Sequence, residues 1–370
     1  MSEINEHVVK LTHALETLRN KQARIYFLTM DTKGQAKASV ALIYDTVKEL
    51  RNNGYNAIIM HEKEDFQDVT SWLGEGYKDI PHISIESKKI QVMLSDLVII
   101  PEVFGHVLEQ TKDMPCEKLI LSQAYDFVLE TIPPGSTWPM YGVHTCITTS
   151  SAQTEYLKTL MAGVHYFDFT PKIGDEFKKY EKPQPPIISI HTRDARDTMK
   201  IIKSFYIKFP QFKWVTFRDL RNLPRNKFAE DLSESCVSLW VDDISGFGTF
   251  PLESMKCGVP VIGKVPNLKP DWMTDDNGVW TYDYNGIVDV LGSYLQKWLE
   301  DAIPSELYNE MKKTISKYSN ENFKTSLLAI FDSIYDKKIR DVRINLEKLT
   351  PINPDEKPDL VKVSDSIDNN

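Results

Sequence analysis

The sequence predicts an α/β protein made of two doubly wound domains that face each other across a cleft. Three observations support this prediction. Short apolar runs of strand type alternate with helical patterns along most of the chain. A proline-rich segment, 180–186, interrupts the alternation, and a new strand pattern starts directly after it at Ile187. The length of 370 residues is enough for two domains, each with its own core.

The composition is that of a globular protein. Hydrophobic residues make up 41% of the chain and charged residues 26%, as in ordinary folded domains. The net charge of −9 weighs against broad binding to nucleic acid or to an anionic membrane. The N-terminus lacks the apolar core of a signal peptide, and no apolar run is long enough to span a membrane. We therefore expect a cytoplasmic protein.

The cysteines lack the CxxC spacing of metal and redox sites. Three of the four lie in or beside apolar runs, so we expect buried free thiols rather than disulfides. The four are Cys116, Cys146, Cys236 and Cys257.

The first half begins with an amphipathic helix over 5–20, followed by alternating strands and helices. The expected elements are strand 24–30, helix 36–52, strand 55–60, strand 97–100, helix 104–112, strand 118–121, strand 143–149 and helix 152–161. The loop after the first strand contains Gly34, at the sheet edge where α/β proteins bind ligands. A ligand loop and an ordinary strand-to-helix turn fit Gly34 equally well.

Three prolines within 183–186 predict a stiff connector, which we take as the domain boundary. The expected elements after it are strand 187–191, helix 197–209, strand 214–217, helix 225–233, strand 236–241, a short helix, strand 259–262, strand 279–281 and helices 285–302, 304–318 and 321–337. The predicted domains are 1–182 and 183–318, followed by a helical segment 319–350 and a tail 351–370. The tail is rich in Pro, Asp and Asn and is expected to be disordered.

One stretch of the second half, 236–263, has the pattern of a ligand-binding loop in a parallel sheet. A buried strand pattern is followed by two glycines, a short helix, a third glycine and another strand pattern. Glycines let backbone N–H groups approach an anion, and the N-terminus of the helix adds a partial positive charge. Glu253 lies in the first turns of that helix, where its carboxylate could accept two hydrogen bonds from a sugar diol.

This stretch resembles the nucleotide-sugar site of GT-B glycosyltransferases, particularly the retaining enzymes of glycosyltransferase family 4. From Ser245 to Ile262 the chain reads SGFGTFPLESMKCGVPVI, against the family signature EGFGxxxxEAMAxGxPVI. The resemblance implies two Rossmann-like domains, an acceptor domain first and a nucleotide-sugar domain second, with a C-terminal helix crossing back to the first. It also implies that Glu253 holds the ribose, whereas Ser245 replaces the acid that helps to hold the donor sugar.

The expected nucleotide-sugar ligands combine this motif with the glycine of the first domain and an acid at the end of the preceding strand. They are Gly34, Asp243, Ser245, Gly246, Phe247, Gly248, Thr249 and Glu253. Asp243, like its neighbour Asp242, could contact sugar hydroxyls in place of the acid lost at Ser245, or cap the loop through an Asx-turn.

Three residues are expected to act in catalysis. The resemblance implies that an Arg and a Lys after the first strand of the second domain bind the diphosphate, which maps to Arg193 and Lys200. Together they would offset the charge of the leaving group. The alternative is a surface helix start that pairs its charges internally. Asp126, after a strand of the first domain, could orient or deprotonate an acceptor hydroxyl, which would suit inversion rather than retention.

The resemblance implies transfer of a sugar from a UDP-, GDP- or ADP-sugar to a hydroxyl of a glycan, a lipid-linked sugar or another acceptor. Family enzymes generally need no bound metal, and the eight histidines show no ligand spacing, so we expect neither metal nor cofactor. Retaining transfer is thought to need no protein nucleophile, because the leaving phosphate itself takes the acceptor proton.

Three other functions stay open. A phage-type glycosyltransferase acting on DNA bases would need clustered Lys and Arg, and the acidic balance weighs against it. A catalytically inactive nucleotide-sugar-binding partner is permitted by Ser245. A two-lobed solute-binding protein is disfavoured by the missing signal peptide.

Peripheral contact with a membrane, as in many family enzymes, would need exposed aromatic residues. Those considered are Trp72, Phe104, Trp138 and Tyr141.

Overall fold

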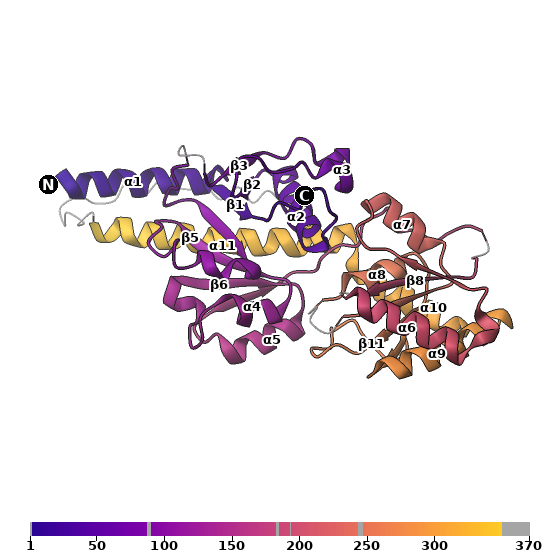
Figure 1. Cartoon of the computed structure of the whole chain (residues 1–370). Helices are drawn as coiled ribbons and strands as arrows, with labels where there is room; N and C mark the ends of the chain where they lie inside the picture. Colours follow the sequence, from indigo (N-terminus) through magenta and orange to yellow (C-terminus); the bar gives the residue numbers. More distant parts are fainter. Residues whose placement is uncertain (1, 87–89, 183–184, 193, 243–246, 350–370) are drawn as a thin grey trace, which may run out of the picture.

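The computed structural model describes residues 2–86, 90–182, 185–192, 194–242 and 247–349. Two sheets, each flanked by helices, form two lobes (Figure 1). Neighbouring strands of both sheets run parallel. Loops at the carboxyl ends of parallel strands share one edge of the sheet, and ligands of such folds bind there. The predicted fold class, two doubly wound α/β domains, is confirmed.

The first domain has a seven-stranded sheet of order β3-β2-β1-β4-β5-β6-β7. Its strands are β1 Arg24–Leu28, β2 Asn56–His61, β3 His82–Ser84, β4 Leu97–Pro101, β5 Glu117–Ser122, β6 Val143–Thr148 and β7 His165–Asp168. Its helices are α1 Ser2–Arg19, α2 Ala38–Asn52, α3 Thr70–Leu73, α4 Tyr125–Thr131 and α5 Ser151–Leu160, with 3₁₀ turns η1 Glu75–Tyr77, η2 Glu102–Val107 and η3 Trp138–Tyr141. Strand residues alternate between two cores: Phe27 packs on the side of α2, and Leu28 on the other.

The second domain has a five-stranded sheet of order β12-β11-β10-β8-β9. Its strands are β8 Ile187–Thr192, β9 Thr216–Asp219, β10 Val237–Val241, β11 Val261–Lys264 and β12 Val279–Thr281. Its helices are α6 Ala195–Lys208, α7 Arg225–Ser233, α8 Thr249–Lys256, α9 Tyr284–Leu299 and α10 Ser305–Ile315, with 3₁₀ turns η4 Pro210–Phe212 and η5 Ser316–Tyr318. Strand β10 lies in the middle, buried at every position, so its carboxyl end lies at the centre of the sheet edge.

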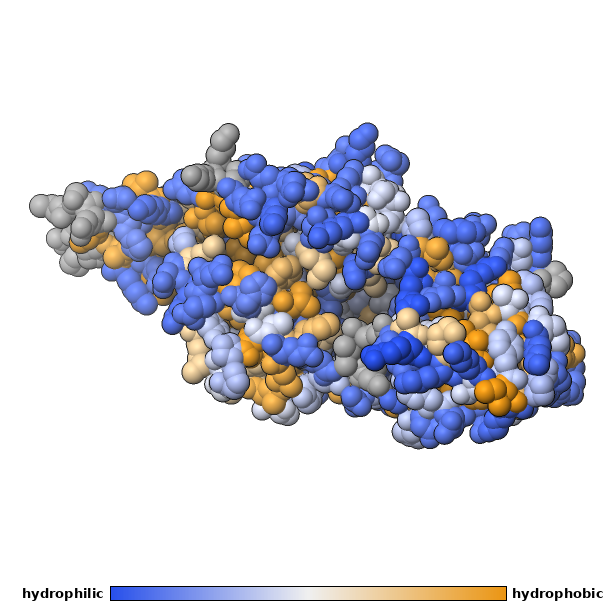
Figure 2. Space-filling view, in the orientation of Figure 1, coloured by the Kyte–Doolittle hydropathy of each residue, from blue (hydrophilic) through white to orange (hydrophobic). Residues whose placement is uncertain are grey.

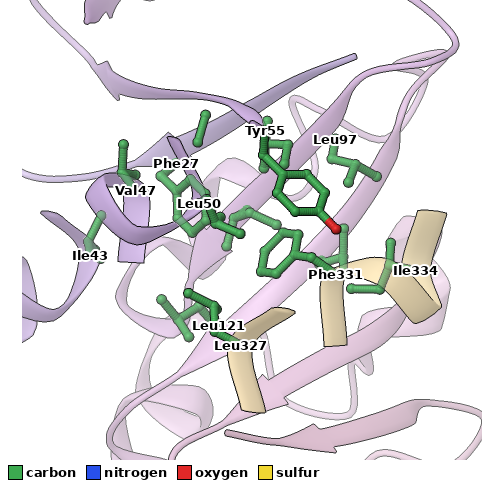
Figure 3. Close-up of a cluster of buried hydrophobic side chains, with 14 of the residues drawn as sticks. Phe27, Ile43, Val47, Leu50, Tyr55, Leu97, Leu121, Leu327, Phe331 and Ile334 are labelled. Atoms are coloured by element: carbon green, nitrogen blue, oxygen red, sulfur yellow. The ribbon is translucent and has the colours of Figure 1, made fainter. Parts of the chain in front are cut away.

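The last helix, α11 Asn320–Leu349, returns to the first domain, as predicted. Phe331 lies 6.2 Å from Phe27 and 6.1 Å from Tyr55 between ring centroids, in the core on the α2 side (Figure 3). The helix extends beyond the predicted end at 337 because α1 lies beside it and covers further apolar positions (Figure 1). The core of the first domain is therefore closed by the C-terminal part of the described chain.

The connection between the domains belongs to both cores. Phe169 packs in the core of the first domain on the α2 side. Ile173 and Phe177 pack in a core of the second domain. The Ile173 N–H donates to the carbonyl of Tyr318 at 3.0 Å, and Lys256 Nζ donates to the Ile173 carbonyl at 2.7 Å. The chain thus packs against the second domain before it reaches the proline-rich segment 180–186, which marks the predicted boundary.

Several local predictions differ from the structure. The helix predicted over 104–112 is instead the 3₁₀ turn η2, in which Phe104 has non-helical dihedral angles. Strands β3 and β7 and helix α4 were not predicted, because each is short and mixes apolar and polar residues without a clear pattern. All four cysteines are buried free thiols, as expected.

The surface gives no support to membrane contact through the aromatic residues considered above. Trp72, Trp138 and Tyr141 are buried in the cores, and Phe104 is partly buried. On the face shown in Figure 2, hydrophobic residues form separate groups among hydrophilic ones. Among the helices of the described chain, none is long and apolar enough to cross a membrane.

Candidate functional site

The glycine loop after β10 is shaped by packing in the second domain. Gly248 is the N-cap of α8 and has φ +74°, a conformation that favours glycine. A Cβ atom there would lie 2.9 Å from the Trp240 ring and 3.2 Å from the Trp272 ring. The backbone therefore passes directly over two indoles, and only glycine fits.

Phe247 anchors the same loop. Its side chain is buried, and its carbonyl accepts a hydrogen bond from Trp272 Nε1 at 2.5 Å. Its ring meets Tyr318 edge to face, with centroids 5.6 Å apart. Phe247 thus has a structural position in the core, directly before the first turn of α8. Thr249, the first residue of α8, is half-buried beside it.

Glu253 lies one turn further along α8. Burial raises the pKa of its carboxyl to about 8; Arg225 acts in the opposite direction and Glu176 adds to the rise. The carboxyl is therefore largely protonated near neutral pH. Ribose hydroxyls that donate to the carboxylate would favour its ionised form.

Arg225, at the start of α7, connects Glu253 to the first domain. Its Nη1 lies 3.1 Å from Asp45 Oδ2 on α2, and its Nε contacts Glu176. Asp45 also binds Lys172 Nζ at 3.1 Å and accepts a hydrogen bond from the Tyr77 hydroxyl at 2.5 Å. We call Asp45, Lys172, Glu176 and Arg225 the interdomain ion cluster.

The charges of this cluster compensate one another. Burial alone would raise the pKa of Asp45, but Arg225 and Lys172 outweigh it and hold that pKa below its usual value. Asp45 is 3% exposed, so its ionised form depends on these two cations. The cluster therefore fixes the first domain against the second immediately beside Glu253.

A second contact joins the domains at the N-terminus of α5. The Asp271 carboxylate accepts hydrogen bonds from the backbone N–H groups of Ser151 and Ala152, at 2.7 and 3.0 Å, and from Ser151 Oγ at 2.8 Å. A cavity of about 340 Å³ lies beside this contact. It is lined by Thr149, Ser150, Ser151, Asp168, Phe169, Thr170, Asp271, Trp272, Lys317, Tyr318 and Asn322.

The other predicted site residues lie on separate elements. Gly34 has φ +74° in an exposed loop after β1, and Asp126 lies in the first turn of α4, after β5. The neighbour of Asp126, Tyr125, interacts with it and with Asn267 of the second domain. Asp126 is therefore close to the domain interface. Its role, like that of Gly34, stays a prediction.

Lys200 has a partner of its own. It lies on α6, is mostly exposed, and forms an ion pair with Asp197 at 3.2 Å. This is the internal pairing that a surface helix start would show, and a diphosphate would have to compete with it. Four predicted residues, Arg193, Asp243, Ser245 and Gly246, lie outside the described residues.

Sequence reasoning missed the residues that join the domains. Asp45, Lys172, Arg225 and Asp271 belong to no motif. One signal was present: Asp45 lies in an apolar run, ALIYDTV, on the buried face of a predicted helix. A carboxylate in such a position needs a buried partner. In the described part of the chain, no group of three or more His, Cys, Asp or Glu residues could hold a metal ion.

Two facing parallel domains, a glycine loop and acid at the start of α8, and a last helix that crosses back define the GT-B fold of glycosyltransferases. Solved structures agree. Sucrose-phosphate synthase from Thermosynechococcus elongatus matches with a TM-score of 0.63 and 12% identity, over 85% of this chain and all of that one. HepE of Anabaena, in complex with UDP and glucose, matches with a TM-score of 0.60 and 10% identity, over 84% of this chain and all of that one.

A third structure, the pneumococcal O-GlcNAc transferase GtfA with UDP and GlcNAc, has a TM-score of 0.57 at 10% identity and covers 88% of this chain and 99% of that one. Among curated proteins, an α-1,6-glucosyltransferase of Actinobacillus pleuropneumoniae serotype 7 (strain AP76) is 20% identical in an alignment of 318 residues, gaps included, that covers 81% of this chain and 92% of that protein. No family model matches. The chain has the GT-B fold and is similar to glycosyltransferases, while membership of family 4 stays a prediction.

Proposed function

We propose that this protein is a glycosyltransferase that moves a sugar from a UDP-sugar to a hydroxyl acceptor. The observation that carries the proposal is the arrangement of Gly248 and Glu253 at the start of α8, in a chain of GT-B fold. The curated relative is a glucosyltransferase, and two of the fold neighbours were solved with UDP. Glucose is therefore the sugar to test first.

The site residues have distinct roles in this proposal. The N-terminus of α8 and the glycine loop bind the diphosphate through backbone N–H groups, with Arg193 and Lys200 as its cations. Glu253 accepts hydrogen bonds from the ribose hydroxyls. Gly34 and Asp126 lie on the acceptor domain, where Asp126 orients the acceptor hydroxyl.

The proposed reaction is metal-independent and proceeds with retention. The leaving phosphate takes the acceptor proton, and the protein contributes position and electrostatic stabilisation of the developing charge. Inversion, with Asp126 as the base, is the alternative stereochemical outcome.

Calorimetric titration tests the donor site. We expect UDP to bind, and Glu253→Ala to weaken that binding about ten- to a hundredfold, because hydrogen bonds to a charged group are lost. Glu306→Ala on α10, an exposed acid in the first turn of its helix, is the control and should leave binding unchanged. The proposal fails when the protein does not bind UDP, or when Glu253→Ala binds UDP like the wild type.

A nucleotide-sugar-binding partner without catalytic activity is the second candidate, because Ser245 replaces the acid that the family uses on the donor sugar. It predicts the same binding of UDP and UDP-glucose. It differs in turnover: neither hydrolysis of UDP-glucose nor transfer to an acceptor would occur. Release of UDP from UDP-glucose, followed with time, distinguishes the two.

A further inference from the structure

A group of buried polar atoms lies at the carboxyl ends of β1 and β2, on the acceptor domain. Thr29 Oγ1, Thr32 Oγ1 and His61 Nδ1 are all buried, and none has a hydrogen-bond partner among the described residues. The Thr29 N–H donates to the Met60 carbonyl at 2.9 Å, which continues the pairing of the two strands and sets Thr29 beside His61.

Thr29 and His61 point to the same face of the sheet. Side chains alternate along a strand, and Phe27 and Ile59, two residues earlier in each strand, both lie in the core on the α2 side. Tyr44 of α2 lies 3.5 Å from His61 Nε2, which agrees with that direction. The side chains of Thr29 and His61 therefore both lie on the α2 side of the sheet, at the edge that faces ligands in this fold.

The neighbours of His61 assign the proton on its ring. The Tyr44 hydroxyl lies 2.9 Å from His82 Nε2, and His82 also hydrogen-bonds to the backbone of Ile80. His82 thus donates to Ile80 through its other nitrogen and accepts from the Tyr44 hydroxyl, whose oxygen accepts from His61 Nε2–H. His61 Nδ1 is left as a bare acceptor. Burial, and then His82, lower the pKa of His61 to about 4, so the ring is neutral at physiological pH.

The surroundings of this group resemble a site for a neutral, hydroxyl-rich molecule. The half-exposed ring of Phe66 stacks on His61, with centroids 4.0 Å apart and planes 9° from parallel. Asp31 and Asp68 lie nearby, and their charges disfavour an anionic ligand. An aromatic face, carboxylates and neutral acceptors together suit the apolar face and the hydroxyls of a sugar.

Two loops, 30–37 and 62–69, contribute to the group: Thr32 belongs to the first and Phe66, which stacks on His61, to the second. They are joined by a hydrogen bond of 3.3 Å from the Gln67 N–H to Asp31 Oδ1. Lys33 and Gly34 at the tip of the first loop both have positive φ, and both are exposed. Parting of these loops would expose His61 Nδ1 without disturbing the sheet.

We propose that Thr29, Thr32 and His61 form the subsite that binds a hydroxyl of the acceptor sugar, with Phe66 against its ring. This rests on the proposed function, in which the first domain binds the acceptor and Glu253 of the second domain binds the donor. Burial of unpartnered polar atoms destabilises the empty protein, and the bound hydroxyl restores the missing hydrogen bonds.

The decisive variant is Thr29→Val, which removes the hydroxyl and keeps the shape of the side chain. We expect it to raise Tm, because an unpartnered buried group disappears. We also expect it to weaken binding of methyl α-glucoside or N-acetylglucosamine about two- to tenfold in the presence of saturating UDP, the value of a hydrogen bond between neutral groups. Binding of UDP should not change.

Thr46→Val is the matched control. Thr46, a residue of α2, is also buried, but its hydroxyl donates to the Leu42 carbonyl at 2.7 Å. Its replacement should lower Tm or leave it unchanged, without an effect on sugar binding. His61→Phe, which keeps a ring against Phe66 and removes both nitrogens, should abolish sugar binding and retain UDP binding.

The subsite proposal is overturned when Thr29→Val leaves sugar binding unchanged, whatever its effect on Tm, since the hydroxyl then serves another partner such as a buried water. It is equally overturned when the wild type binds UDP but neither sugar. Absence of UDP binding to the wild type would instead contradict the proposed function itself.

Discussion

Arg225 should be the most sensitive charged residue of the domain interface. Arg225→Met removes a guanidinium that lies 3.1 Å from Asp45 and also contacts Glu176. Its side chain is 15% exposed and that of Asp45 is 4% exposed, so solvent screens the pair only weakly. After the change, Lys172, which pairs with Asp45, is the remaining cation of the interdomain ion cluster.

The expected loss of stability is about 3–5 kcal/mol, the usual cost of leaving a buried charge without its partner. This is a large part of the stability of an ordinary domain, which is about 5–15 kcal/mol. Asp45→Asn on its own should also be costly. The free energy of unfolding of the double variant should fall by about 1–3 kcal/mol less than the sum of the two single losses. The reason is that the second change removes the charge that the first leaves buried without a partner.

Urea unfolding followed by tryptophan fluorescence measures all three variants. Lys227→Met is the control on the same helix: Lys227 is 52% exposed and pairs with Glu230 and Asp231 of that helix. Its loss should cost less than about 1 kcal/mol. An Arg225→Met variant as stable as Lys227→Met, or strictly additive effects of Arg225→Met and Asp45→Asn, would refute the cluster as described.

Three further predictions concern the loop, the pH dependence and the α5 contact. Gly248→Ala should lower the free energy of unfolding by about 2–4 kcal/mol, because its φ is positive and the new Cβ would meet the Trp240 ring. Gly54→Ala, where φ is +84° but the space is open, should cost about 1 kcal/mol in the same unfolding assay. The folded pKa of Glu253, about 8, lies above the unfolded value, so wild-type stability should fall as pH rises through about 4.5 to 8. The free energy of unfolding of Glu253→Gln should not show this fall, so that relative to the wild type it gains about 2–4 kcal/mol between about pH 5 and 9. Parallel pH dependences of the two proteins would contradict the raised pKa of Glu253. Asp271→Asn should cost about 1 kcal/mol through the α5 N-terminus, against no loss for Asp275→Asn, whose side chain is 96% exposed.

The fold was predictable because its long elements have clear periods. Helix α7 and strand β12 were placed to the residue, and β1, β5 and β8 to within two residues at either end. Strand β12 is equally short, but the turn residues 275–278 before it mark its start. Strands β3 and β7 escaped because polar residues stand among their three or four positions. They are edge strands, and their existence depends on pairing with neighbours that the sequence does not specify.

The site was predictable only where chemistry is written in consecutive residues. The stretch from Phe247 to Glu253 carries its glycine, helix start and acid within seven positions. Arg225 and Asp45 are 180 positions apart and meet only in the folded chain. The His61 group likewise combines the ends of two strands, and no spacing along the sequence relates Thr29 to His61.

The return of α11 to the first domain sets the order in which the chain can fold during synthesis. Phe331 completes the core around Phe27, but the ribosome adds it about 300 residues later, a delay of roughly 15–60 s at ordinary elongation rates. Through that interval the first domain exposes the surface that α11 will cover, while the second domain is still being made. A chain released before residue 320 would keep that surface exposed permanently, and we expect such truncated chains to aggregate.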